Sequence, residues 1–82
     1  MMVAVTIRSY VMLPDAPPDF RLGRPFELHV DEHTTVAHLT DCVLAIPPGE
    51  VALVAVDGQL AELEYVVGEH DRVDLFPPIM GG

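Results

Sequence analysis

The chain has 82 residues, of which 50% are hydrophobic, so it can form one small domain with a single core, which excludes intrinsic disorder and leaves no room for a separate catalytic domain. The 13 acidic residues, against four arginines and no lysine, give a net charge of -9, which makes phosphate backbones and anionic lipids poor partners. We therefore expect no binding to nucleic acid or to membranes, and a protein partner with a basic docking face.

The single cysteine, Cys42, cannot form an internal disulfide, which is typical of a protein in a reducing compartment. Residues 1–4 lack the positive charge that opens a secretory signal, and no apolar run approaches the roughly 20 residues that span a bilayer. We therefore expect a cytoplasmic protein. Cys42 falls at the edge of a predicted helix stripe, where a small buried thiol is the ordinary explanation.

Two β-strands are predicted at residues 3–12 and 26–31, because both segments alternate apolar with polar side chains. Residues 13–24 lie between them and hold three prolines, a glycine and two aspartates, so the chain must turn there. Phe20 and Leu22 are expected to hold this loop against the core. The two strands can then pair as a hairpin.

A helix of about three turns is predicted next, with Thr34 or Thr35 as its N-terminal cap. It must end before Pro47, because consecutive prolines remove two backbone donors. Its buried stripe is expected to follow the spacings 3, 4 and 3, which select Val36, Leu39, Val43 and Ile46.

Further strands are predicted at residues 51–56, 65–67 and 72–76, with a turn at Asp57-Gly58 after the first of them. The order is therefore strand, strand, helix, strand, short strand, strand. This order predicts an α+β fold of the β-grasp type, in which one main helix packs on a mixed sheet of four to five strands. We expect the domain to occupy residues 1–76.

Residues 77–82 are expected to form an extended, flexible C-terminal tail. Pro77 and Pro78 cannot donate strand hydrogen bonds, and they stiffen the chain into an extended path. Gly81 and Gly82 carry no Cβ, so a partner's walls can close around the last two peptide units and leave the terminal carboxylate reachable. The competing explanation is that terminal glycines are simply a frayed end.

The strand and tail together are more specific than the two glycines. Residues 72–82, preceded by Gly-Glu-His-Asp at 68–71, resemble the ending of the MoaD/ThiS family of ubiquitin-like sulfur-carrier proteins. The likeness is greatest to the small subunit of molybdopterin synthase, which ends in an apolar strand, Phe-Pro-Pro and Gly-Gly. It extends to residues 54–58 and to Thr35-Val36, and covers most of the chain except residues 13–24.

This resemblance implies a β-grasp fold and places the chemistry at the carboxylate of Gly82. An adenylyltransferase of the ubiquitin-activating type would adenylate that carboxylate with ATP. A sulfur donor would then convert it to a thiocarboxylate, and a sulfur-accepting synthase subunit would receive the sulfur, with molybdopterin as the favoured product. The residues expected to contact these partners are Phe76, Pro77, Pro78, Ile79, Met80 and Gly81.

The chain itself is expected to be a carrier without a bound cofactor and without enzyme activity, or the non-catalytic small subunit of a molybdopterin-synthase-like enzyme. It has no lysine and no phosphate-cradling glycine loop with which to perform adenylation. Two departures matter: Met80 stands where molybdopterin-type members commonly have alanine, and Pro77-Pro78 argues against the thiamine branch. A ubiquitin-like protein modifier and a β-grasp interaction module without tail chemistry remain alternatives.

Two other groups of side chains have simpler explanations than a site. His29, His33 and His38 are close in sequence, but no cysteine or carboxylate completes a ligand set of fixed spacing, so no metal site is predicted. A second group of acids is expected to form a solvated face that can also steer docking onto basic surfaces. Its members are Glu62, Glu64, Glu69, Asp71 and Asp74.

Overall fold

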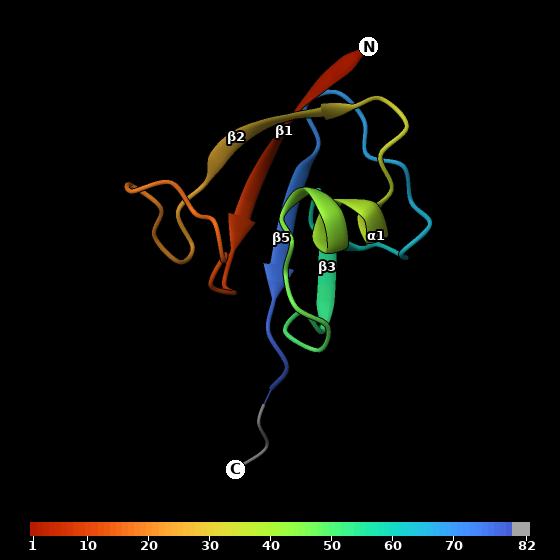
Figure 1. Ribbon diagram of the computed structural model, residues 1–82. Helices are drawn as coiled ribbons and strands as arrows, with labels where there is room; N and C mark the ends of the chain where they lie inside the picture. Colours follow the sequence, from red (N-terminus) through yellow and green to blue (C-terminus); the bar gives the residue numbers. More distant parts are fainter. Residues whose placement is uncertain (80–82) are drawn as a thin grey trace.

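The protein folds into a five-stranded mixed sheet with a short helical segment packed against one face (Figure 1). The computed structural model describes residues 1–79. The sheet order is β2-β1-β5-β3-β4, in which β1 and β5 are parallel and every other pair is antiparallel. The predicted α+β class and β-grasp arrangement are therefore confirmed. The elements are β1 (Met2–Ser9), β2 (Phe26–Asp31), α1 (Val36–His38), the π-helical turn η1 (Leu39–Val43), β3 (Leu53–Val56), β4 (Gln59–Leu60) and β5 (Arg72–Phe76).

The core lies between the sheet and the helical segment. Ile7 of β1, Leu39 of η1 and Leu75 of β5 are fully buried, and the predicted hairpin of β1 and β2 pairs Val5 with Leu28. Burying an aliphatic side chain of this size contributes about 1.5 to 3 kcal/mol. The neighbouring strands β1 and β5 therefore supply much of the stability of this small domain.

The loop at residues 13–24 differs in part from the prediction. Phe20 does pack against the core, and its ring meets Phe26 edge-on at 6.1 Å between centroids. Leu22, however, is 53% exposed, so its predicted anchoring role is wrong. Backbone contact replaces it, because the N–H of Gly23 donates to the carbonyl of Ser9 at 2.8 Å.

The helix begins as predicted. Thr35 is the N-terminal cap, and its Oγ1 accepts a hydrogen bond from the N–H of His38 at 3.1 Å. The N–H of Val36 donates to the carbonyl of Tyr65, so the first turn is also tied to the segment before β5. His38 faces solvent, as expected for the polar side of the helix.

The second half of the helix is wider than an α-helix, and this changes which side chains are buried. The N–H of Leu44 donates to the carbonyl of Leu39, five residues earlier, at 2.9 Å. The extra residue in the turn brings Leu44 onto the core in place of Val43, which is 40% exposed. Ile46 is buried as predicted, whereas Cys42 is exposed and its expected burial is wrong.

The strand prediction at residues 51–56 is confirmed only for Leu53–Val56. The Asp57-Gly58 turn is confirmed: both residues have positive φ, 51° and 84°, as a tight hairpin turn requires. The turn leads directly into the two-residue strand Gln59–Leu60, which the sequence did not predict because two residues show no alternation.

The predicted strand at residues 65–67 is wrong. Val66 makes only an isolated bridge with Thr35, so this segment runs across the start of the helix instead of joining the sheet. The β-branched residues there serve packing: Val67 is 1% exposed and belongs to the core.

The π turn generates a test of the helix phase. Leu39→Ala should lower the free energy of unfolding by about 2 to 5 kcal/mol, because it leaves a cavity in the core. Val43→Ala should cost less than about 1 kcal/mol, because Val43 is largely exposed. Urea unfolding followed by circular dichroism measures both. Equal damage from the two substitutions would show that the helix is regular and Val43 buried.

Candidate functional site

The C-terminal chain leaves the domain from the end of β5, which lies between two neighbouring strands. Leu75 pairs with Val54 of β3 and with Ser9 of β1, and its side chain is fully buried. The carbonyl of Phe76 accepts a hydrogen bond from the N–H of Ala52 at 2.8 Å, so the strand is held up to its last residue. The chain then leaves at the end of the molecule opposite the N-terminus (Figure 1).

Phe76 lies on the opposite face of the sheet from Leu75, and its ring stacks on Tyr10. The ring centroids are 5.3 Å apart and the planes differ by 9°. Gly23 lies close to the Tyr10 ring: a Cβ at Gly23 would stand 3.0 Å from Cε1 of that ring. The absence of a side chain at Gly23 therefore lets the loop pack closely against Tyr10.

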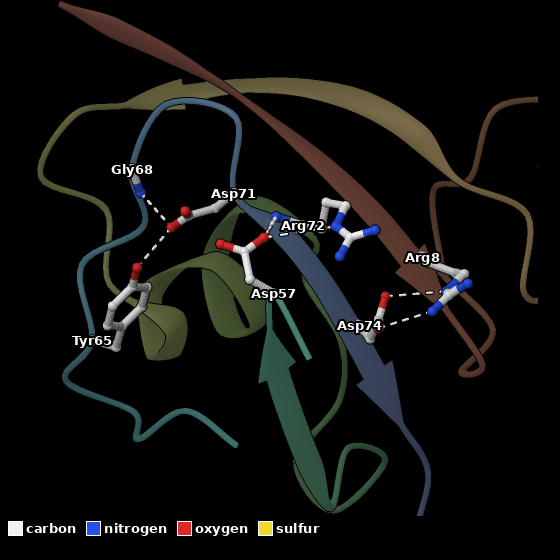
Figure 2. Close-up of polar contacts among 7 residues, drawn as sticks. All are labelled: Arg8, Asp57, Tyr65, Gly68, Asp71, Arg72 and Asp74. Atoms are coloured by element: carbon white, nitrogen blue, oxygen red, sulfur yellow. Dashed lines mark hydrogen bonds and ion pairs between the residues drawn. The ribbon is translucent and has the colours of Figure 1, made fainter. Parts of the chain in front are cut away.

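A bidentate ion pair on the same face joins β1 to β5. The Nε and Nη2 atoms of Arg8 donate to Oδ1 and Oδ2 of Asp74 at 3.1 and 3.0 Å (Figure 2). The hydrogen bond and charge of Asp74 raise the pKa of Arg8 above its usual value. The guanidinium carbon of Arg8 lies 6.0 Å from the centroid of the Tyr10 ring. The ion pair therefore holds Arg8 beside the aromatic stack.

The start of β5 is held by two aspartates (Figure 2). Oδ1 of Asp57 accepts a hydrogen bond from the N–H of Arg72 at 3.0 Å. Oδ2 of Asp71 accepts from the hydroxyl of Tyr65 and from the N–H of Gly68, both at 2.8 Å. Asp71 therefore closes the turn that brings the chain into β5.

Two of the five acids expected on a solvated face, Asp71 and Asp74, are half-buried, whereas Glu69 is exposed as predicted. Asp71 anchors the turn before β5, Asp74 in the middle of β5 pairs with Arg8, and Oε1 of Glu69 accepts a hydrogen bond from the N–H of Ala4 at 2.7 Å. Glu62 and Glu64 are exposed, as predicted. Three of these five acids therefore remain on a solvated face.

Two of the four histidines, His29 and His33, lie near glutamates. Nε2 of His29 lies 3.7 Å from Oε1 of Glu27, and Nε2 of His33 lies 3.7 Å from Oε1 of Glu32. Within residues 1–79, no three His, Cys, Asp or Glu side chains are grouped so that they could hold a metal ion. No helix in that same part of the chain is long and apolar enough to cross a bilayer.

The structure places part of the predicted contact site. Phe76 is half-buried in its stack, and Pro77, Pro78 and Ile79 are exposed, with Ile79 at 93%. The remaining predicted positions, Met80, Gly81 and Gly82, lie outside the described residues.

Sequence reasoning missed Arg8, Tyr10 and the role of Asp74. The alternation in residues 3–12 already put Arg8 and Tyr10 on the polar face of their strand. The β-grasp order places that strand parallel to the last one, which is what brings these side chains beside Asp74 and Phe76. The missing step was to combine the two observations.

The β-grasp sheet and the chain that projects from its central strand define a ubiquitin-like protein. A family model described as Mut7-C ubiquitin matches residues 2–80, and the chain belongs to this family. The ubiquitin-like β-grasp character expected from the resemblance to the MoaD/ThiS family is thereby confirmed.

Two solved structures share the fold. SAMP1 from Haloferax volcanii aligns with a TM-score of 0.66 and 21% identity, over 96% of this chain and 99% of that one. Ubiquitin from Caldiarchaeum subterraneum aligns with a TM-score of 0.65 and 20% identity, over the full length of both chains. A comparison with curated proteins found no match.

The Tyr65–Asp71 hydrogen bond generates a prediction about alkaline pH. The bond needs the neutral phenol, and it raises the pKa of Tyr65 above its ordinary value of about 10. A raised pKa means that the folded state binds the proton more tightly than the unfolded state. Its contribution is therefore complete below about pH 10 and is lost as the pH rises through the raised pKa.

Tyr65→Phe should accordingly lower the free energy of unfolding by up to about 1 kcal/mol at neutral pH, because the bond is partly exposed. The difference from the wild type should shrink above about pH 10. Urea unfolding at a series of pH values measures it. A stability difference that stays constant across this pH range would show that the hydrogen bond to Asp71 does not raise the pKa of Tyr65.

Proposed function

We propose that this chain is a sulfur carrier that acts through the carboxylate of Gly82. The observation that carries the proposal is the exposed run Pro77 to Ile79, which projects from a rigidly held strand and is followed by Gly81 and Gly82. Six extended residues reach about 20 Å, far enough to enter a partner's active site while the domain stays outside.

The chemistry would proceed in two displacements. A carboxylate oxygen of Gly82 attacks the α-phosphorus of ATP in the partner, and pyrophosphate leaves. Hydrosulfide, the simplest sulfur source, then attacks the acyl carbon, AMP leaves, and loss of the sulfur-bound proton gives the thiocarboxylate. Adenylation is needed because a carboxylate is a poor electrophile, whereas the thioacid that results is a good sulfur nucleophile. Delivery of that sulfur to a synthase subunit completes the cycle, and the Phe-Pro-Pro run favours molybdopterin as the product.

Partner docking depends on the surface of this chain, whereas the chemical steps take place in the partner's active site. The activating adenylyltransferase is expected to present a basic face, because the chain has a net charge of -9. The aromatic stack of Tyr10 and Phe76 gives that partner a rigid apolar contact at the root of the tail. We place the cycle in the cytoplasm, where the exposed thiol of Cys42 and a thiocarboxylate both remain reduced.

A second candidate function uses the same carboxylate. The full-length structural match to an archaeal ubiquitin favours a protein modifier, in which an amine of a target protein attacks the acyl adenylate of Gly82, AMP leaves, and an amide bond to the target forms. The two functions share adenylation and differ only in the nucleophile that follows. An interaction module without tail chemistry would show neither product.

The tail prediction separates these possibilities. The chain is incubated with an activating enzyme, ATP and a sulfur source, and the intact mass is measured. Replacement of one oxygen by sulfur supports carriage, whereas conjugates with other proteins support modification. Deletion of Gly82, or Gly81→Val, should abolish adenylation while the circular dichroism spectrum stays unchanged.

Met80→Ala is the matched control for these tail variants. It changes an adjacent residue into the one that molybdopterin-type carriers commonly have, so adenylation should persist. Activation that survives loss of Gly82 would refute the carrier function and the modifier function together.

A further prediction concerns the stack at the root of the tail. Tyr10→Ala should raise the KM for the carrier in adenylation by about threefold to tenfold, because an aromatic pair contributes about 0.5 to 1.5 kcal/mol. The kcat should change little, because Tyr10 stacks on Phe76, which precedes the reacting Gly82 by six residues in the sequence. Tyr10→Phe keeps the ring and should behave as the wild type. An unchanged KM in Tyr10→Ala would mean that the stack does not support docking.

A further inference from the structure

An open groove of about 640 Å³ runs along the edge of β3 that faces away from β5. β4 pairs with β3 only at Ala55 and Val56, so no strand of the described chain covers that edge at Leu53. The turn after η1, at residues 46–49, lines the groove together with residues 60–64. In Figure 1 this turn is drawn in green at the end of the molecule where the C-terminal chain leaves.

The groove is lined by leucines that the core does not bury. Leu53 is 49% exposed, Leu60 is 72% exposed and Leu63 is 59% exposed, and all three line this one hollow. A single exposed leucine is ordinary on a protein surface. Three that converge on a hollow, next to Val51 and Ile46, form a contiguous apolar surface of the kind that marks an interaction site.

Charge around the groove has one sign. The charged side chains that line it are Asp41, Glu62 and Glu64, and no arginine or histidine is among the lining residues. Within residues 1–79, none of these three acids takes part in an ion pair. Their charges are therefore available to a cationic partner.

The arginines lie elsewhere on the molecule. Arg8 and Arg72 line a separate hollow on the open face of the sheet, and Arg21 and Arg24 lie in the loop between β1 and β2. The side of the domain formed by η1, β3 and β4 thus presents apolar and acidic groups together.

We propose that this groove is a docking site for a short segment of a partner protein that carries apolar side chains next to lysine or arginine. The leucines of the groove would bury the apolar side chains, and Asp41, Glu62 and Glu64 would pair with the flanking cations. A second copy of this chain fits less well, because it would bring two acidic rims together.

This inference goes beyond the carrier function, because the groove does not involve the tail chemistry. The groove does lie next to Phe76, the residue before the tail, because Leu53 lines the groove and is the register partner of Phe76. None of residues 77–79 lines the groove, so a segment bound there would contact the domain next to the start of the tail. One protein could retain the domain while another active site works on Gly82.

The test is a titration of the ¹⁵N-labelled full chain with a synthetic ten-residue peptide that alternates leucine with arginine, followed by amide chemical shifts. No ATP or activating enzyme is present, so the result is independent of carriage. We expect the shift changes to centre on the lining residues of the groove. A matched peptide that alternates leucine with glutamate should not bind.

Two pairs of variants locate the contact. Leu60→Ser combined with Leu63→Ser should weaken binding at least about tenfold, because exposed leucines can be changed without loss of the core. Leu22→Ser is the matched control, because Leu22 is 53% exposed and lies outside the groove; it should leave the affinity within about twofold. Glu62→Gln with Glu64→Gln should weaken binding, and Asp15→Asn with Asp19→Asn should not.

Three outcomes would overturn the proposal. One is the absence of binding by the arginine peptide. Another is a set of shift changes that centres on Arg8 and Asp74, which would assign the peptide to the open face of the sheet. The third is a concentration-dependent doubling of mass without peptide, with shift changes in the groove, which would make a second copy of this chain the occupant.

Discussion

The position of β5 between β1 and β3 is the constraint on which the rest of the structure depends. Alternate side chains of this strand serve opposite needs: Val73 and Leu75 fill the core, whereas Asp74 and Phe76 hold the open face. Because the strand is hydrogen-bonded on both sides, it cannot leave the sheet without opening the core. The direction of the chain that follows Phe76 is therefore fixed by the same contacts that stabilise the fold.

The two faces of the sheet and the partly uncovered edge of β3 provide three separate surfaces. The inner face is covered by the helical segment and supplies stability. The outer face holds the Arg8–Asp74 pair and the Tyr10–Phe76 stack beside the exit of the tail. The uncovered edge of β3 carries the leucine groove. In the function we propose, the domain meets several partners in turn, and separate surfaces would let each partner bind without displacing another.

Much of this arrangement could be predicted from the sequence, because the strands carry strong patterns. Residues 26–31 and 72–76 alternate cleanly, and the structure gives those strands the predicted bounds. The predicted burial of Val43 was wrong because spacings of 3 and 4 assume a regular α-helix, and no residue near Leu39 signals a π turn. The strand predicted at residues 65–67 was wrong because β-branched residues favour strands and are also common in cores outside strands. Arg8 and Tyr10 escaped notice because their partners are distant in sequence.

The placement of the two tyrosines makes β5 observable by spectroscopy. The chain has no tryptophan, and its tyrosines, Tyr10 and Tyr65, stand at opposite ends of this one strand. Tyr10 lies against the last residue of β5, and Tyr65 donates to the aspartate that precedes the first. The tyrosine fluorescence of the unlabelled protein therefore comes from these two positions alone. Quenching or enhancement on mixing with a partner would follow the environment of β5, and each tyrosine can be silenced by its phenylalanine variant to assign the signal.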